Sequence, residues 1–401
     1  MDLWYQDPAQ FAARLAESQN SVAQMARDTG VPRSTLKDWK GRHGIEIGVA
    51  AVAPDAELLK QNETLRLENS RLRRHATATA AGDIATERVI ERIEAAVVTQ
   101  RPTWGPAEVE IPEGGKTAQE LVLLYSDLHA AEVVTSEGTR GINEYDWNVM
   151  TDRMAVIQRA TLSHAQHVGF SISKLHIHML GDMLSGDIHE ELAITNDRPL
   201  AEAVVDLAYE HVPWLLAFAE EFPHVHVAGV PGNHPRRSKK PSFKEASNNA
   251  DWLFYQMIAA LLKGHPQFTF DFPRGGFNVQ MICDRWRSLL MHGDGIRSTM
   301  PGVPWGGVIR RVTTLEAQFN AARQPLDYVE MGHFHTTNSL DGIHARTFVN
   351  GSVKGADEYS LANFGSGRDA EQTLLSFHPK RGYTGSYAIN LQATVPGSEG
   401  W

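Results

Sequence analysis

The sequence has a single cysteine, Cys283, among 401 residues, so no disulfide can form within the chain. It has no run of about 18 apolar residues, the length that a membrane-spanning helix needs, and we expect no membrane span. Its start, Met1 to Asp7, has no basic segment followed by an apolar one and is not typical of a signal peptide. Together these absences predict a protein of the reducing cytoplasm.

The chain is also short of positive charge, with a net charge of −10. Residues 118–401 carry 23 basic and 31 acidic residues, a net charge of −8. Such a segment is a poor general binder of polyanions. Bound divalent cations would reverse the field locally, however, so a nucleic-acid substrate stays open.

Residues 20–43 have the pattern of two short helices joined by a tight turn. Gly30 suits the position in that turn that needs a positive φ, and Pro32 suits the first turn of the second helix. The pattern resembles a helix-turn-helix, and we expect residues 1–50 to form a small all-α domain. Four apolar residues fall on its inward positions: Met25, Val31, Leu36 and Trp39.

The second of these helices begins with polar side chains that would face a DNA major groove or its phosphates: Arg33, Ser34, Thr35 and Lys37. Residues 20–44 carry five basic and two acidic residues, a net charge of +3. DNA is therefore the expected partner of this domain. A helical hairpin used for protein contacts is the alternative.

Residues 51–117 are expected to be a helical linker. Leucines recur every seven residues at 58, 65 and 72, which places Asn62 and Asn69 at the a positions of a short coiled coil. A buried asparagine at an a position favours a parallel dimer in register, so we expect a homo-oligomer. A solvated helix is the alternative. An amphipathic helix is expected over 83–98 and a proline-rich linker over 101–117.

From residue 118 onward, short apolar runs alternate with helical stretches, which predicts an α/β domain over 118–401. The expected strands are 120–126, 174–180, 224–230, 277–282, 287–292, 327–331 and 345–350. The expected helices are 146–167, 198–221, 245–263 and 306–322.

Five polar segments each follow an apolar run of this domain. In order they are Asp127-Leu128-His129, Gly181-Asp182, Gly232-Asn233-His234, His292 and Gly332-His333-Phe334-His335. In an extended Asp-x-His segment both side chains point to the same side, so they can hold one metal. His333 and His335 follow the same rule, but a turn there can divide them between two metals. Glycine before Asp182, Asn233 and His333 allows a sharp turn.

The order of these segments resembles that of calcineurin-like metallophosphoesterases. The resemblance covers residues 120–352 and implies a four-layer αββα sandwich of two sheets flanked by helices. By this resemblance, Asp127, His129 and His335 hold a first divalent metal, and Asn233, His292 and His333 hold a second. Asp182 bridges both and serves catalysis with His234, which stabilises or protonates the transition state. Carboxylate, amide and imidazole ligands suit Mn²⁺ first, with Fe or Zn²⁺ as alternatives.

Two features lie beside this pattern. The superfamily often has an acidic residue after Gly-Asn-His, but here Pro235 follows, so His234 needs another orienting partner, such as Asp187 or the surroundings of His129. A basic run begins at the site, and we expect it to contact substrate phosphate: Arg236, Arg237, Lys239 and Lys240.

Asp294 is expected to support His292 rather than bind metal. His176 and His178 are expected to be hydrogen-bonded core residues.

These patterns together predict a two-metal phosphodiesterase or nuclease that its helix-turn-helix delivers to DNA. Alternatives are a phosphomonoesterase resembling protein phosphatases, a cyclic-nucleotide phosphodiesterase, and a DNA-binding assembly protein whose phosphoesterase domain is a scaffold. The Gly-Asp-x-x-Asp-Arg-Gly and Gly-Asn-His-Glu motifs of the protein phosphatases are not matched at Gly181 and Gly232.

Overall fold

A computed structural model describes residues 3–18, 21–45, 118–188, 192–238, 247–296, 303–364 and 367–392. The expected coiled coil and the rest of the 51–117 linker lie outside these ranges, as do Lys239 and Lys240. The chain divides into two compact units, Met1–Gly82 and Asp83–Trp401. Within the described ranges, no helix has both the length and the apolar character needed to cross a bilayer.

The described part of the first unit is helical, with η1 (Trp4–Gln6), α1 (Pro8–Glu17), α2 (Val22–Thr29) and α3 (Arg33–Arg42). Asp7 caps α1, because its carboxylate accepts hydrogen bonds from two backbone N–H groups of the first turn at 2.9 and 3.1 Å. Gly30 ends α2 at a φ of 71°, as expected for the turn. The expected inward positions are confirmed, since Met25 and Leu36 are fully buried and Val31 and Trp39 pack against them.

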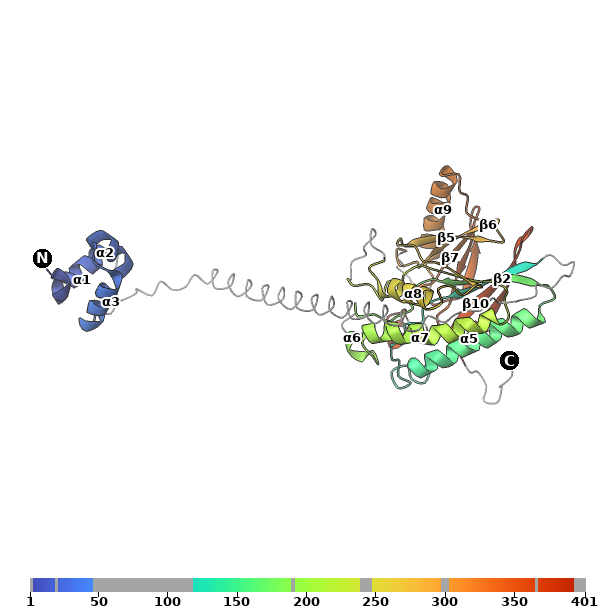
Figure 1. Cartoon of the computed structure of the whole chain (residues 1–401), viewed down its shortest axis with the longest axis horizontal. Coiled ribbons are helices and arrows are strands. Elements are labelled where there is room, and N and C mark those ends of the chain that lie inside the picture. Colours follow the sequence, from blue (N-terminus) through green and yellow to red (C-terminus); the bar gives the residue numbers. More distant parts are fainter. Residues whose placement is uncertain are drawn as a thin grey trace. The chain divides into compact units, whose positions relative to one another are not determined.

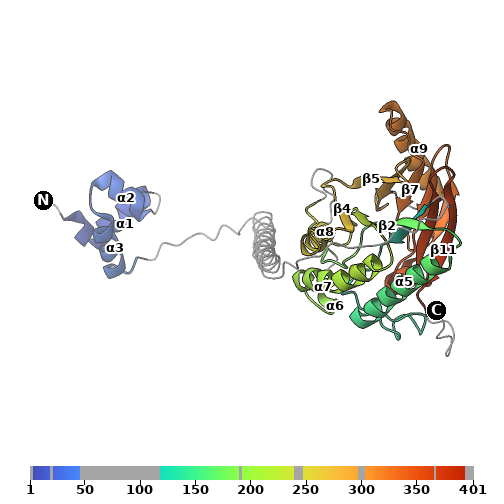
Figure 2. The same cartoon turned by 45° about the vertical axis from the view of Figure 1, so that its right-hand side comes forward.

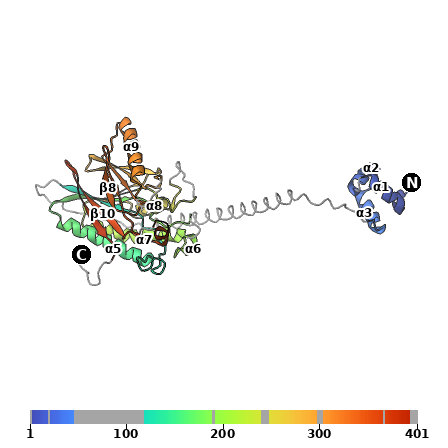
Figure 3. The same ribbon diagram turned by 180° about the vertical axis from the view of Figure 1, so that it is seen from behind.

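The second unit contains two β-sheets, which Figure 3 shows from behind. The six-stranded sheet has the order β11-β10-β1-β2-β3-β4 and the five-stranded sheet the order β5-β6-β7-β9-β8. The first is built from β1 (Gln119–Tyr125), β2 (Ile172–Met179), β3 (Val225–Gly229), β4 (Phe268–Asp271), β10 (Glu371–His378) and β11 (Gly382–Asn390). The second is built from β5 (Phe277–Ile282), β6 (Trp286–Met291), β7 (Tyr328–Met331), β8 (Asn338–Asp341) and β9 (Arg346–Val349). All seven expected strands are present.

Helices cover the outer faces of the two sheets. These are α5 (Trp147–His167), α7 (Leu200–Ala219), α8 (Ala250–Leu261) and α9 (Trp305–Ala321), with the shorter α6 (Leu192–Thr195) and α10 (Glu358–Phe364). Figures 1 and 2 show α5 and α7 side by side, with α9 on the other side of the sheets. The four long helices match the expected ones within a few residues.

Side chains of β1 show how the layers are held together. Leu121 and Leu123 belong to a core shared with α5, α7 and α8, whereas Val122 and Leu124 belong to a core shared with β6, β7 and β9 of the other sheet. A third core lies between the second sheet and α9. Since β1 is buried on both faces, its sequence is a continuous apolar run. The expected four-layer αββα sandwich is confirmed.

Polar side chains also bridge the two sheets. His178 Nδ1 of β2 lies 2.5 Å from Glu330 Oε2 of β7, and His226 Nε2 of β3 lies 2.8 Å from Gln280 Oε1 of β5. His176 Nε2 lies 2.8 Å from Glu120 Oε2. His176 and His178 are hydrogen-bonded core residues, as expected.

Candidate metal centre

The five polar segments all leave the carboxyl ends of parallel strands. β1, β2 and β3 run parallel in one sheet, and β6 and β7 run parallel in the other. Asp127 and His129 follow β1, Asp182 follows β2, Asn233 and His234 follow β3, His292 follows β6, and His333 and His335 follow β7. The carboxyl edge of an open sheet is where α/β proteins place their ligands.

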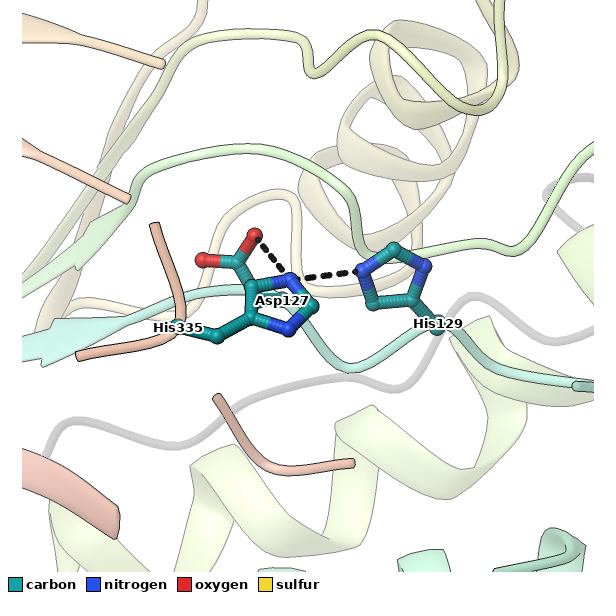
Figure 4. A group of neighbouring side chains, drawn as sticks. All are labelled: Asp127, His129 and His335. Atoms are coloured by element: carbon teal, nitrogen blue, oxygen red, sulfur yellow. Dashed lines mark hydrogen bonds and ion pairs between the residues drawn. The ribbon is translucent and has the colours of Figure 1, made fainter. Parts of the chain in front are cut away.

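Three of these side chains form one group, which Figure 4 shows. His335 Nε2 lies 3.3 Å from Asp127 Oδ1 and 3.2 Å from His129 Nε2. Asp127 and His129 are buried, and the His335 side chain is 25 % exposed, so the group opens to solvent on the His335 side. These are the three residues to which the family resemblance assigns a first metal.

A second group lies beside the first. His292 Nε2 lies 3.0 Å from Asp182 Oδ2 and 3.0 Å from Asn233 Oδ1. One nitrogen of His333 lies within 4.8 Å of ligand atoms of both Asp182 and His292. His333 and His335 therefore belong to different groups, the second of the two arrangements that the sequence left open.

Asp182 joins the two groups. Its Oδ2 atom, 3.0 Å from His292, also lies 4.0 Å from His129 Nε2 in the first group. The side chain is 1 % exposed. This is the position that a bridging carboxylate requires.

The spacing of these atoms fits divalent cations. A six-coordinate metal with bonds of about 2.1 Å at right angles places neighbouring ligand atoms about 3 Å apart. The nitrogen–oxygen and nitrogen–nitrogen separations of 3.0 to 3.3 Å in both groups match that spacing. Two imidazole nitrogens that face each other at 3.2 Å, as those of His129 and His335 do, repel unless a proton or a cation lies between them. The donor set of both groups therefore fits divalent cations.

The backbone at these residues differs from the expected extended alternation. Asp127, His129 and Asp182 have φ values of 56°, 50° and 52°, and His333 and His335 have values of 71° and 49°. All five lie in the left-handed region, which is costly for residues other than glycine and is found where surrounding structure enforces it. The expectation that an extended backbone points both side chains of Asp-x-His to one side is wrong. Turns that follow the strands bring these side chains together instead.

The glycines before three of the ligands have two different roles. Gly181 has a φ of 91°, as the sharp turn required. Gly232 and Gly332 do not have a positive φ. A Cβ at Gly232 would lie 2.1 Å from Asp182 Oδ1, and one at Gly332 would lie 2.5 Å from Asp127 Oδ2. These two glycines leave room for the carboxylates.

Gly232→Ala is therefore expected to disrupt the second metal group, because the new methyl group occupies the space of the Asp182 carboxylate. We expect metal binding to fall by at least tenfold, measured by equilibrium titration with Mn²⁺. Gly306→Ala is the matched control, since its Cβ would have no neighbour within 4 Å and it lies in α9. Metal binding by Gly232→Ala at the level of Gly306→Ala would contradict the assigned geometry.

His234 lies at the junction of the two groups. Its ring is 4.4 Å from the ring of His129, centroid to centroid and edge-on, and its backbone N–H donates to Asp182 Oδ1 at 2.8 Å. The surroundings of His129 therefore contact this ring, whereas Asp187 is exposed. A nitrogen of His234 is also within 4.8 Å of ligand atoms of His129 and Asp182.

Burial and neighbouring charge set the protonation of the site. Burial lowers the pKa of His234 to about 3 and, with help from His292, lowers that of His333 to about 4. Burial would also lower the pKa of His292, but Asp182 and Asp127 raise it to about 10. Burial would raise the pKa of Asp182, yet the neighbouring histidines hold it well below its usual range. Ionised carboxylate and neutral imidazole are the forms that bind metals, so Asp182 and His333 are in the binding form, whereas His292 has to release a proton when a metal binds.

Asp251 is a site residue that the sequence reasoning missed. It is fully buried at the start of α8, and its carboxylate accepts backbone N–H groups of Met183 at 3.1 Å, Leu184 at 3.2 Å and Gly232 at 2.9 Å. Asn249, the N-cap residue of α8, donates to the Gly232 carbonyl at 2.9 Å. The start of α8 therefore fixes the loops that carry Asp182 and Asn233. An Asn-x-Asp sequence inside the expected 245–263 helix was the available signal, since Asn249 caps the helix that begins at Ala250.

The basic run is partly described. Arg236 Nε donates to the Asn233 carbonyl at 3.0 Å, and its Nη2 lies 3.2 Å from Asp294 Oδ2. Asp294, expected to support His292, pairs with this arginine. Arg237 is exposed. Arg236 is therefore anchored directly beside a candidate ligand, while the structure does not describe Lys239 and Lys240.

No family model and no curated protein matches this sequence. Among solved structures, the chain is similar to a predicted phosphoesterase from Streptococcus pneumoniae, at 9 % identity and a TM-score of 0.28 over 68 % of this chain and 98 % of that one. It is similar to Vacuolar Protein Sorting 29 from Cryptosporidium parvum, at 14 % identity and a TM-score of 0.30 over 68 % and 99 %. A third is an archaeal phosphodiesterase, at 10 % identity and a TM-score of 0.32 over 67 % and 99 %. Similarity at this level does not by itself assign a function.

Proposed function

We propose that the chain is a two-metal phosphoester hydrolase of the calcineurin-like type, acting as a phosphodiesterase or nuclease on nucleic acid. One observation carries the proposal. Five segments from two sheets converge so that Asp182 lies between two groups of metal-ligand side chains, with separations of 3.0 Å to His292 and 4.0 Å to His129. This arrangement is what two cations sharing one carboxylate need.

Bound divalent metals would supply a hydroxide of lowered pKa and Lewis-acid stabilisation of the phosphoryl oxygens. Asp127, His129 and His335 would hold one metal, and Asn233, His292 and His333 the other. Asp182 would help to hold both metals, and its Oδ1 accepts the His234 backbone N–H at 2.8 Å. His234, kept neutral by burial, is suited to donate an N–H to a phosphoryl or leaving oxygen. Arg236 is suited to contact a substrate phosphate.

The rival functions differ in the substrate that they predict. A phosphomonoesterase would prefer p-nitrophenyl phosphate, and a cyclic-nucleotide phosphodiesterase would prefer cyclic nucleotides. A scaffold would hydrolyse neither, but the chain keeps every ligand that the superfamily motif assigns, which favours an enzyme. Mn²⁺ is proposed as the metal, with Fe or Zn²⁺ as alternatives.

A metal-dependent activity panel tests the proposal. Metal-free protein would be reconstituted with Mn²⁺, Fe²⁺ or Zn²⁺ and offered bis-p-nitrophenyl phosphate, p-nitrophenyl phosphate, single- and double-stranded DNA, RNA and cyclic nucleotides. We expect hydrolysis of the diester and of nucleic acid to exceed that of the monoester. Exclusive hydrolysis of p-nitrophenyl phosphate would instead support the phosphomonoesterase.

We further propose that the N-terminal helices deliver the enzyme to DNA and that residues 55–74 mediate self-association. Arg33, Ser34 and Lys37 are exposed on α3, and Thr35 is half-buried. The acidic catalytic unit, at −8 over 118–401, would hold duplex DNA poorly without them.

Removing residues 1–50 is expected to weaken duplex binding and flatten its salt dependence, while hydrolysis of bis-p-nitrophenyl phosphate persists. The reason is that every assigned metal ligand lies at or after Asp127. Arg33→Ala in the full chain should lower the slope of log K against log salt by about 1. Arg14→Ala removes one positive charge from α1 instead of α3, and it is the control for the loss of charge alone. Equal duplex affinity with and without residues 1–50 would give the helices a protein-contact role.

A further inference from the structure

A lysine is buried next to the metal centre. The side chain of Lys354 is 2 % exposed, and its Nζ lies 2.8 Å from Glu132 Oε1 and also bonds Asp357 Oδ2. A buried charge is tolerated only when it is paired and hydrogen-bonded. The two carboxylates provide that pairing, so Lys354 and Glu132 hold each other in place.

The second oxygen of Glu132 faces a candidate metal ligand. Glu132 Oε2 lies 3.3 Å from His129 Nδ1, while the opposite nitrogen of that ring, Nε2, lies 3.2 Å from His335 Nε2. Glu132 itself is 6 % exposed. A carboxylate on one ring nitrogen and a metal on the other is a common arrangement, because the carboxylate fixes the tautomer and the ring orientation.

The turn that carries Lys354 is fixed to the strand end that carries the first ligands. Ser352 Oγ donates to the Asp127 carbonyl at 2.9 Å and accepts the Lys354 backbone N–H at 3.0 Å. The Lys354 carbonyl accepts hydrogen bonds from Asn143 Nδ2 at 2.9 Å and from Arg153 Nη1 at 2.6 Å. The lysine is thus placed by a rigid network rather than by a surface loop.

We propose that Glu132 and Lys354 are positioning residues for His129: the Glu132 carboxylate, which faces Nδ1 at 3.3 Å, favours the tautomer whose Nε2 faces the first metal, and Lys354 holds that carboxylate in its orientation. The inference rests on the two-metal proposal above. The proposal predicts that Glu132 and Lys354 affect the affinity for the first metal and not for the second. Neither residue contacts Asn233, His292 or His333 through any interaction described for this site.

The test compares two buried glutamates of matched surroundings. Glu120 is also 6 % exposed, and it contacts His176 Nε2 at 2.8 Å and Lys174 Nζ at 3.7 Å, away from the candidate ligands. Mn²⁺ binding to metal-free protein would be followed by calorimetric titration, and the visible spectrum of the Co²⁺-loaded protein would report ligand geometry. Glu132→Gln should weaken one of the two metal sites by about 10- to 100-fold and alter the Co²⁺ spectrum. Glu120→Gln should lower thermal stability but bind both metals as wild type does.

Glu132→Asp provides a second variant if Glu132→Gln does not fold. It keeps the negative charge for Lys354 but withdraws the carboxylate from His129 by one methylene group, so the same single site should weaken. Wild-type metal affinity at both sites in the folded Glu132 variants would overturn the positioning role of Glu132 and Lys354. Equally weakened metal binding in Glu120→Gln would overturn it as well. A wild-type protein that binds no metal would instead refute the two-metal function itself.

Discussion

Asp182→Asn is expected to abolish phosphoester hydrolysis, by at least about 10³-fold, while the fold is retained. Two metals that share a carboxylate stabilise the transition state by several kcal/mol, and each 1.4 kcal/mol is about a factor of ten in rate. Asparagine has nearly the same volume and keeps one oxygen to accept the His234 backbone N–H, now bonded to Asp182 Oδ1 at 2.8 Å. With that oxygen kept in place, the amide puts an NH₂ group where Oδ2 faces both groups of candidate ligands, and an NH₂ group does not bind metals.

Hydrolysis of bis-p-nitrophenyl phosphate, metal content and thermal unfolding would be measured on the same preparation. Asp187→Asn is the matched control, because it removes an exposed carboxylate five residues along the same loop. Activity of Asp182→Asn within tenfold of the control would show that Asp182 does not bridge a catalytic metal pair.

His234→Ala is expected to lose about 10²-fold or more in rate while retaining both metals. The loss follows from removing a group that stabilises charge or transfers a proton in the transition state. The ring lies 4.4 Å from that of His129, close enough to reach a substrate at the metals. Its pKa, lowered to about 3 by burial, favours hydrogen-bond donation by the neutral ring.

Metal stoichiometry decides between two roles for His234. One of its nitrogens lies within 4.8 Å of ligand atoms of His129 and Asp182. A variant that binds one metal fewer than wild type would reassign His234 as a ligand. His226→Ala is the control for removing a histidine outside the two ligand groups, since His226 bonds Gln280 between the sheets at 2.8 Å.

The sequence predicted the parts of the fold that have strong local signals. β1, β2, β3, β6 and β7 are short apolar runs that end in polar residues, and each was placed within two residues. β4 and β8 were not predicted, since each has four residues and lies at the edge of its sheet. β10 and β11 were also missed. The alternating exposure of β11 at another edge leaves little apolar signal, whereas β10 is a buried interior strand in which polar residues interrupt the apolar ones.

The candidate site was predictable as a set of residues but not as a geometry. The resemblance in the order of the segments indicated how the side chains group, whereas the left-handed turns at Asp127 and Asp182 and the close approaches depend on contacts between distant loops. Glu132 and Lys354 could not be assigned from sequence, because 222 residues separate them. For Asp251 the sequence signals a helix start but not the contact with Met183, 68 residues away.

Crystals of the full chain grown with Mn²⁺, with anomalous scattering recorded at the manganese edge, test the central claim most directly. The account predicts two anomalous peaks about 3.5–4 Å apart. Asp182 should contact both, with Asp127, His129 and His335 on one peak and Asn233, His292 and His333 on the other. A single peak, or metal bound away from Asp182, would contradict the two-metal centre.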